Sequence, residues 1–199
     1  RFASVPIRNA GTLGGNVANG SPIGDSMPAL IALDATVVLR KGPRGRERAL
    51  EDFYLDYQKT DLQPGEFVER IIVPRGQPGV TFRAYKISKR FDQDISALCG
   101  AFRAEIEGGT VKSIRIAYGG MAAVPKRAKA VEAALAGKPW TEASVRAAMA
   151  AFADDFKPIS DMRASAGYRA KVAANLLQRF FLDTGAGAPA VRLYGRAVA

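Results

Sequence analysis

A glycine-rich segment near the start of the chain combines groups that suit a ligand. It reads GlyThrLeuGlyGlyAsn over 11–16 and continues to Asp25. Gly14 and Gly15 have no Cβ, so a flat ring or a pyrophosphate can approach their backbone N–H groups closely. Asn16 adds uncharged donors, and the Asp25 carboxylate accepts hydrogen bonds. The spacing matches neither the Walker A loop nor the GxGxxG fingerprint. A tight turn followed by a helix capped by Asp25 explains the same residues structurally.

A second group of polar residues lies where a strand should end. The segment 85–94 reads TyrLysIleSerLysArgPheAspGlnAsp. Three basic side chains oppose two acidic ones, an arrangement that sets an electrostatic field and can act as a gate at the entrance to a site. The charges are those of Lys86, Lys89, Arg90, Asp92 and Asp94. A solvated junction between a strand and a loop is the alternative.

A third polar segment, 161–169, favours a structural role. It reads AspMetArgAlaSerAlaGlyTyrArg. Ser165 is expected to cap the last helix, because its side chain can accept a free N–H of the first turn. Asp161 is expected to pair with Arg163 or Arg169.

The composition excludes several kinds of chemistry. The 199 residues include no histidine, which removes histidine general bases, Ser-His-Asp triads and most zinc sites. The single cysteine, Cys99, can neither close an internal disulfide nor ligate an iron–sulfur cluster, which needs about four thiolates. Cys99 is expected to be a small buried hydrophobe. No metal site is therefore expected in this chain.

Charge and hydropathy limit the kinds of partner. The net charge of +10 is dispersed, without the interleaved aromatic residues of a base-stacking groove, so no nucleic-acid partner is expected. Small basic clusters at 40–48 and 126–129 are expected to be solvated. No apolar run of roughly 18 residues predicts a membrane span. Low cysteine use and the lack of a signal sequence favour a cytoplasmic protein. The missing initiator Met hints that the natural chain begins earlier, unless the start was processed or recloned.

Hydrophobic periodicity and turn residues predict an α+β protein in two units, with a boundary near 74–80. The first unit is mostly antiparallel sheet with a short helix, and its residues 1–20 are typical of a ligand-facing loop or tight turn. The second is a three-stranded antiparallel sheet packed on a three-helix bundle, followed by a loose tail. Strands are predicted at 35–39, 46–50, 66–74, 81–88, 95–106 and 111–118, and helices at 25–33, 126–136, 142–156 and 165–184.

Four segments of the chain resemble segments of a known protein family. Residues 2–25, which contain GlyGlyAsn and SerProIleGlyAsp, are similar to the second half of the FAD-binding domain of the molybdenum hydroxylases. Residues 85–96, 118–128 and 161–169 are similar to that family's flavoprotein C-terminal domain. The resemblance covers about residues 2–184. Within the family, LysArgPheAspGlnAspIleSer is more similar to the small subunit of bacterial xanthine dehydrogenases than to carbon monoxide dehydrogenases.

The resemblance implies a division of the chain and a set of site residues. Residues 1–76 would be the C-terminal half of the FAD-binding domain, 77–185 a domain like the CO dehydrogenase flavoprotein C-terminal domain, and 186–199 a tail. The residues at the family's FAD contacts are Phe2, Gly14, Gly15, Asn16, Asp25, Val68 and Lys86, with Val68 a hydrophobic substitute. The loop 87–94 matches the one that controls access of NAD to the flavin. Its candidate residues are Lys89, Arg90, Phe91, Asp92, Gln93 and Asp94.

The implied function is electron transfer within an oxidoreductase of purine catabolism. In the intact complex, xanthine or hypoxanthine would be hydroxylated at molybdenum, and electrons would pass from [2Fe–2S] clusters through FAD to NAD. The upstream half of the FAD domain and the iron–sulfur domains are not in this sequence, and the molybdenum cofactor belongs to a partner large subunit, so a hetero-oligomer is expected. Such a partial site should hold FAD weakly or not at all when isolated, and this chain alone should be inactive.

Other functions stay open at this point. A related enzyme could act on carbon monoxide, an aldehyde, another heterocycle or a CoA thioester. A non-enzymatic binding or assembly module is the second alternative. No residue of this chain needs to be an acid–base catalyst, because the reaction is that of the cofactors.

Overall fold

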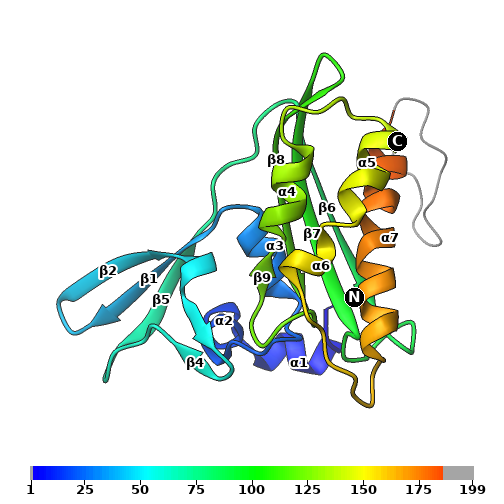
Figure 1. The fold of residues 1–199 in the computed structure, drawn as a ribbon. Coiled ribbons are helices and arrows are strands. Elements are labelled where there is room, and N and C mark those ends of the chain that lie inside the picture. The colour runs from blue at the N-terminus through cyan, green and yellow to red at the C-terminus, as the bar shows by residue number, and fades with distance from the viewer. Residues whose placement is uncertain (1, 186–199) are drawn as a thin grey trace.

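The computed structural model describes residues 2–185, and the predicted tail 186–199 lies outside them. The chain begins with three short helices, α1 (Val5–Ala10), α2 (Leu13–Asn19) and α3 (Ser26–Ala32). An antiparallel sheet follows in the order β2-β1-β5, made of β1 (Thr36–Lys41), β2 (Arg44–Ala49) and β5 (Phe67–Ile72). Between β2 and β5 lie a 3-10 turn, η1 (Leu50–Asp52), and the small hairpin β3 (Tyr54–Asp56) and β4 (Lys59–Thr60). Figure 1 shows the sheet β2-β1-β5 projecting to the left, away from the rest of the molecule.

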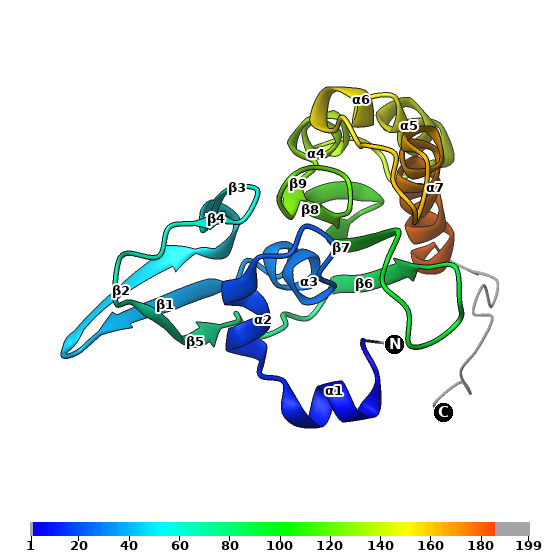
Figure 2. The same ribbon diagram turned by 90° about the horizontal axis from the view of Figure 1, so that it is seen from below.

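The second sheet forms the centre of the molecule. It runs β6 (Val80–Ile87), β7 (Leu98–Glu107), β8 (Thr110–Gly119) and β9 (Lys126–Arg127), all antiparallel neighbours. Gly108 and Gly109 join β7 to β8 with φ of 56° and 76°, which glycine adopts without strain. The helices α4 (Lys129–Leu135), α5 (Glu142–Met149), α6 (Phe152–Asp155) and α7 (Ala166–Thr184) cover one face, and α3 lies on the other (Figure 2). The α+β class is therefore confirmed.

Side-chain size on β7 and β8 explains how both faces of this sheet are buried. Phe102, Ile116 and Tyr118 pack into the apolar core shared with α4–α7. Ala101 and Ala117 point the other way and join the core around α3. Because these two side chains are small, α3 can lie close against the sheet. The segment that leads into α3 is thereby held at the ends of β7 and β8.

The prediction of a loop or tight turn over 1–20 is wrong, because α1 and α2 occupy most of that segment. Thr12 begins α2 by accepting the N–H of Gly15 at 3.0 Å. Pro6 sits in the first turn of α1, where its missing N–H costs nothing. Local capping thus outweighs the low helix propensity of a Gly- and Asn-rich sequence.

The helices after β8 also differ in extent from the prediction. The expected helix at 126–136 begins only at Lys129, and the preceding Lys126 and Arg127 form a fourth strand, β9. The cause is a cap supplied from elsewhere in the chain. The carboxylate of Asp155 accepts the N–H groups of Ala130 and Val131 at 2.9 and 3.1 Å.

The helix expected at 142–156 is divided into α5 and α6, so four helices rather than three cover the sheet. Beyond the break, Phe152 and Phe156 are both buried. Each ring packs edge-on against Tyr118, with centroids 5.6 Å apart. Burial of these two aromatic rings stabilises the change of direction.

The two basic clusters, expected to be solvated, are largely paired. The acidic partners come from neighbouring strands and helices. The ion pairs are Arg40–Glu69 at 2.5 Å, Arg46–Asp61 at 2.6 Å, Arg46–Glu66 at 2.8 Å, Arg127–Glu51 at 2.9 Å and Arg127–Glu132 at 2.5 Å. The fold brings these residues together across 5 to 76 positions of sequence, which the local composition does not reveal.

Two further findings concern residues 2–185. None of their helices combines the length and apolarity required to cross a bilayer. Nowhere in this part of the chain do three or more His, Cys, Asp or Glu side chains gather in a way that could hold a metal ion.

Removal of the cap of α7 is expected to cost about 1 kcal/mol of unfolding free energy. The Ser165 side chain accepts the N–H of Tyr168 at 3.2 Å, as predicted for a cap. Replacing Ser165 with Ala leaves that N–H without its partner. Urea denaturation of both proteins measures the difference, and equal midpoints with equal slopes would contradict the prediction.

Candidate functional site

The glycine-rich segment meets strand β5 at Gly14. A Cβ added to Gly14 would lie 3.5 Å from the carbonyl oxygen of Val68 and 3.7 Å from its Cγ1. Two of the sequence-predicted residues, far apart in the chain, are therefore neighbours. The structure corrects one expectation for Gly15, because its N–H is already used by Thr12 inside α2. The absence of a Cβ still matters there, since one would lie 2.9 Å from the Thr12 Oγ1.

Asn16 and Asp25 are oriented by contacts at the start of α3. The Asn16 Oδ1 accepts a hydrogen bond from the Ser26 hydroxyl, which leaves the Asn16 amide N–H groups as the available donors. Asp25 occupies the N-cap position of α3, but its side chain makes no capping bond, contrary to expectation. Its carboxylate turns toward the second sheet instead.

The Asp25 carboxylate joins the glycine-rich segment 11–25 to the charged segment 85–94. Its Oδ2 accepts from the Lys86 ammonium at 2.7 Å, across 61 positions of sequence. Its Oδ1 accepts from the Ser96 hydroxyl at 2.5 Å. The side chains of Asp25 and Lys86 are 14% and 13% exposed, so the pair is shielded from water without being sealed from it. Lys86 thus pairs with Asp25 rather than with the acidic residues of its own loop.

Cys99 lies beside this pair, and its thiol is expected to be unreactive. Burial raises the pKa of its thiol to about 12, and the nearby Asp25 carboxylate acts in the same direction. The thiol is therefore neutral at physiological pH. As predicted, it is buried as a small apolar side chain, with 4% exposure.

The Cys99 thiol is expected to resist alkylation in the folded protein at pH 8. A pKa raised from 9.0 to about 12 lowers the thiolate fraction about a thousandfold. Because folding favours the neutral thiol, its contribution to stability is present below the pKa of the unfolded state and is lost as pH rises toward 12. Iodoacetamide labelling with and without urea measures the protection. Labelling of native protein at the rate of unfolded protein would contradict it.

A buried arginine that sequence analysis placed only in a possible ion pair ties this region together. The Arg169 Nη1 donates to the carbonyl oxygens of Ala97 and Gly120 at 2.5 and 2.7 Å. Its Nη2 pairs with Asp161 at 2.7 Å, which confirms the predicted pair. The N–H of Gly120 donates in turn to the carbonyl of Pro22 at 2.6 Å. Gly120 has φ of 83°, and an added Cβ would lie 2.5 Å from the Ala97 carbonyl.

The charged loop 87–94 is held by contacts of two kinds. Lys89 donates to the carbonyl of Met162 at 2.6 Å, which links the loop to the segment before α7. Inside the loop, Asp94 accepts the N–H of Arg90 at 2.9 Å and pairs with its guanidinium at 3.2 Å. The backbone N–H of Arg90, the largest effect, and its guanidinium lower the pKa of Asp94 despite desolvation. Asp92 accepts the N–H of Gln93, whose φ is 51°.

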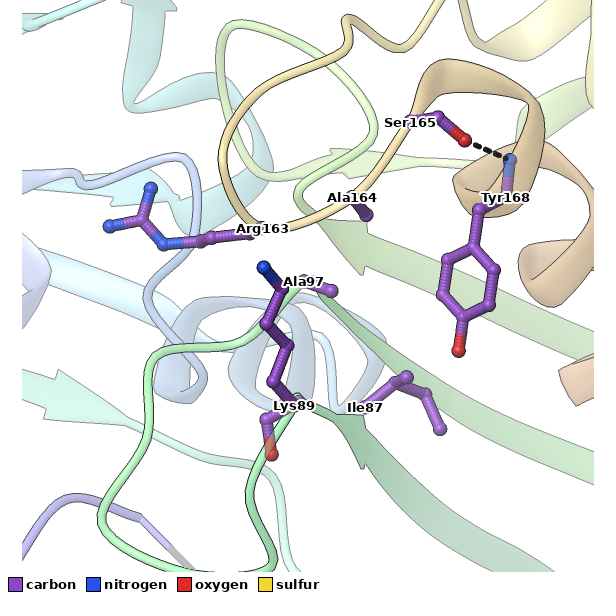
Figure 3. A pocket seen from close by; sticks show the side chains of 8 residues that line it. Ile87, Lys89, Ala97, Arg163, Ala164, Ser165 and Tyr168 are labelled. Carbon is purple, nitrogen blue, oxygen red and sulfur yellow. Dashed lines mark hydrogen bonds between the residues drawn. The ribbon is translucent and has the colours of Figure 1, made fainter.

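A pocket of about 300 Å³ lies between this loop and the start of α7 (Figure 3). Its apolar lining includes Ile87 and Ala97, and its polar lining includes Lys89, Arg163 and Ser165. In Figure 3 the Lys89 side chain extends toward the segment that carries Arg163 and Ala164. Both segments have distinctive sequences, but nothing in their residues predicts that they enclose a common space.

The remaining predicted residues are exposed. Phe2 is 38% exposed, and α1, which follows it, buries none of its side chains. The Phe2 carbonyl accepts from Arg8 at 2.6 Å. Phe91 is 51% exposed in the charged loop. Neither ring is therefore buried.

Two family models match the chain. Residues 1–76 match the family model for the FAD binding domain in molybdopterin dehydrogenase, and residues 83–184 match that for the CO dehydrogenase flavoprotein C-terminal domain. These two domains define the class, which is a flavoprotein built to bind FAD. The chain belongs to the FAD-binding subunit family of the molybdenum hydroxylases, as its sequence blocks predicted.

Individual relatives differ in the substrate that they are named for. Nicotinate hydroxylase of Emericella nidulans is 36% identical over 188 residues, and xanthine dehydrogenase of the same organism is 33% identical over 186. These alignments cover 90% and 92% of this chain but 14% of each relative. The solved structure of carbon monoxide dehydrogenase from Hydrogenophaga pseudoflava superposes with a TM-score of 0.85 at 33% identity, covering 89% of this chain and 62% of that chain. The chain thus spans less than two thirds of these relatives.

Proposed function

We propose that Asp25 and Lys86 form the centre of this chain's contribution to an FAD site. The observation that carries the proposal is their ion pair, which joins the two most family-like blocks at 2.7 Å in a partly shielded position. The other proposed contacts are Phe2, Gly14, Gly15, Asn16 and Val68. Residues 1–76 would supply most of these contacts and residues 77–185 would supply Lys86.

The chemistry of the residues fits this cofactor. Gly14 lies against Val68 and carries no side chain, so a flat ring system could approach its backbone closely. The Lys86 ammonium has three donors, of which Asp25 takes one, and Asn16 offers amide N–H groups. These donors suit carbonyl and phosphate oxygens. Bound FAD would supply the redox chemistry, while the side chains bind it, orient it and exclude water.

We further propose that the intact enzyme is like a xanthine dehydrogenase, with electrons passing from [2Fe–2S] clusters through FAD to NAD. The similarity of 85–96 to xanthine dehydrogenases supports this choice, as does the relative of that name. The molybdenum cofactor would lie in a partner large subunit of a hetero-oligomer. The single cysteine is consistent with a cytoplasmic setting.

A related enzyme for another substrate is the second candidate, because the similar proteins include one named for nicotinate and one for carbon monoxide. A substrate screen of the intact complex separates the two. Xanthine-dependent reduction of NAD supports the first proposal. Turnover of nicotinate, carbon monoxide or an aldehyde with no turnover of xanthine would overturn it.

The FAD site itself is tested separately by binding. In the full-length flavin subunit, replacing Lys86 with Met should weaken FAD binding at least tenfold, since a hydrogen bond from a charged donor contributes about 1.5–3 kcal/mol. Replacing the exposed Arg146 with Met is the matched control and should leave the affinity unchanged, because its pair with Glu142 lies on the surface of α5. Equal FAD affinities of the Lys86 variant and the control would contradict the proposed site.

A further inference from the structure

Ser96 is a buried polar residue that neither the sequence motifs nor the family match assigned to a role. It lies two positions after the charged loop ends and two positions before β7 begins, and it is 1% exposed. Its hydroxyl donates to the Asp25 Oδ1 at 2.5 Å. An ionised carboxylate accepts hydrogen bonds but donates none, so the serine must be the donor.

The backbone holds this hydroxyl in one place. The next residue, Ala97, donates its N–H to the carbonyl of Ile87 at 2.8 Å. The carbonyl of Ala97 accepts from the buried guanidinium of Arg169. Because both polar groups of the following residue are bonded, the backbone that carries Ser96 is held in place before any ligand binds.

The contacts of Asp25 show what the hydroxyl accomplishes. Each carboxylate oxygen has one side-chain donor, with Lys86 on Oδ2 and Ser96 on Oδ1. Asp25 stands at the N-cap of α3, where aspartate commonly accepts backbone N–H groups, yet it makes no such bond. Ser96 therefore supplies a competing donor that keeps the carboxylate turned toward Lys86.

We propose that Ser96 is a positioning residue of the flavin site, which holds the Asp25 carboxylate and through it the Lys86 ammonium in their binding geometry. The inference rests on the proposed FAD site. Ser96 also links the chain just after the loop 87–94 to the Asp25 carboxylate. The loop and the Asp25–Lys86 pair are therefore held by the same hydrogen bond.

The test measures FAD affinity and the absorption spectrum of bound FAD in the full-length flavin subunit. Replacing Ser96 with Ala should weaken FAD binding about tenfold and shift the flavin spectrum, because one carboxylate oxygen loses its donor. Replacing Ser113 with Ala is the matched control. The Ser113 hydroxyl also donates to a carboxylate in the same sheet, that of Glu105 at 3.4 Å, and its loss should change neither quantity.

A double-mutant cycle separates positioning from a general loss of structure. Replacing Asp25 with Ala should weaken FAD binding, and adding the Ser96→Ala change to that variant should alter the affinity less than twofold. If the alanine variant of Ser96 is unstable, Ser96→Cys retains the size and removes the strong donor. Additive effects of the two changes, or unchanged affinity in the Ser96 variants, would overturn the role of Ser96. Unchanged affinity in the Asp25 variant would instead overturn the proposed FAD site.

Discussion

Replacing Arg169 with Met is expected to lower the free energy of unfolding by about 3–5 kcal/mol, the usual cost of breaking a buried ionic contact by removing one partner. The guanidinium is 2% exposed and makes three hydrogen bonds. Two of these satisfy carbonyl groups at the start of β7 and after β8. A methionine can fill the volume, but it cannot donate, so both carbonyls lose a partner in a buried position. Asp161, 26% exposed, can recover part of its hydration.

A surface ion pair of the same residue type is the control for this prediction. Arg146 pairs with Glu142 at 2.7 Å on α5, with side chains 64% and 54% exposed. Its replacement by Met should cost no more than about 0.5 kcal/mol, because water screens such pairs. Urea unfolding followed by circular dichroism gives both values. A loss below 1 kcal/mol in the Arg169 variant would show that the hydrogen bonds of Arg169 contribute little to stability.

Much of the fold was predictable because its strongest signals are local. The alternation of Ile114, Ile116 and Tyr118 predicted β8, and all three are buried on one face. The spacing of Tyr168, Val172, Leu176 and Phe180 predicted a buried stripe on α7. Leu176 and Phe180 are at most 4% exposed, but Tyr168, at the start of the helix, is 49% exposed. Such periods follow from the geometry of strand and helix themselves, so they can be read without knowledge of the partner surface.

The errors concern elements that depend on distant residues. The start of α4 is decided by Asp155, some 25 positions later in the chain. The basic side chain of Arg127 reads as solvated in sequence, but Glu51 lies 76 positions earlier and pairs with it. Neither contact has a local period, so tertiary structure overrides the sequence pattern at both places.

The candidate site also contains residues that the sequence predicts and residues that only the fold reveals. Asp25 and Lys86 were identified through their motifs, and the structure brings them together. Ser96 stands in a recognised motif, but its bond to Asp25 spans 71 positions and has no sequence signature. Gly120 shows a signal that could have been used. A glycine after a strand often marks a positive φ or a close backbone approach, and here it marks both.

The second large effect is expected in the charged loop of the intact enzyme. Replacing both Lys89 and Arg90 with Ala should lower the rate of NAD reduction at subsaturating NAD by about tenfold, since oriented charges at a site entrance raise association rates by 10-fold or more. The rate at which the substrate reduces the flavin should hardly change, because those electrons would arrive from the iron–sulfur side. Stopped-flow measurement of each half-reaction separates the two rates.

The contacts of the two residues refine this prediction. Lys89 also donates to the Met162 carbonyl, so its loss loosens the loop, whereas Arg90 is bound to Asp94 within the loop. The Lys89→Ala variant therefore changes both the position of the loop and its charge, whereas the Arg90→Ala variant changes mainly its charge. A charge effect should shrink as ionic strength rises, and an effect of loop position should not.

Removal of the same amount of charge elsewhere provides the control. Lys112 and Arg146 are 54% and 64% exposed, at the β7–β8 hairpin and on α5. Replacing both with Ala gives the same change in net charge and should leave NAD reduction unaffected. The prediction fails if the Lys89 and Arg90 double variant, with normal flavin content, reduces NAD at the rate of this control. The loop charges would then be solvated side chains without a part in NAD access.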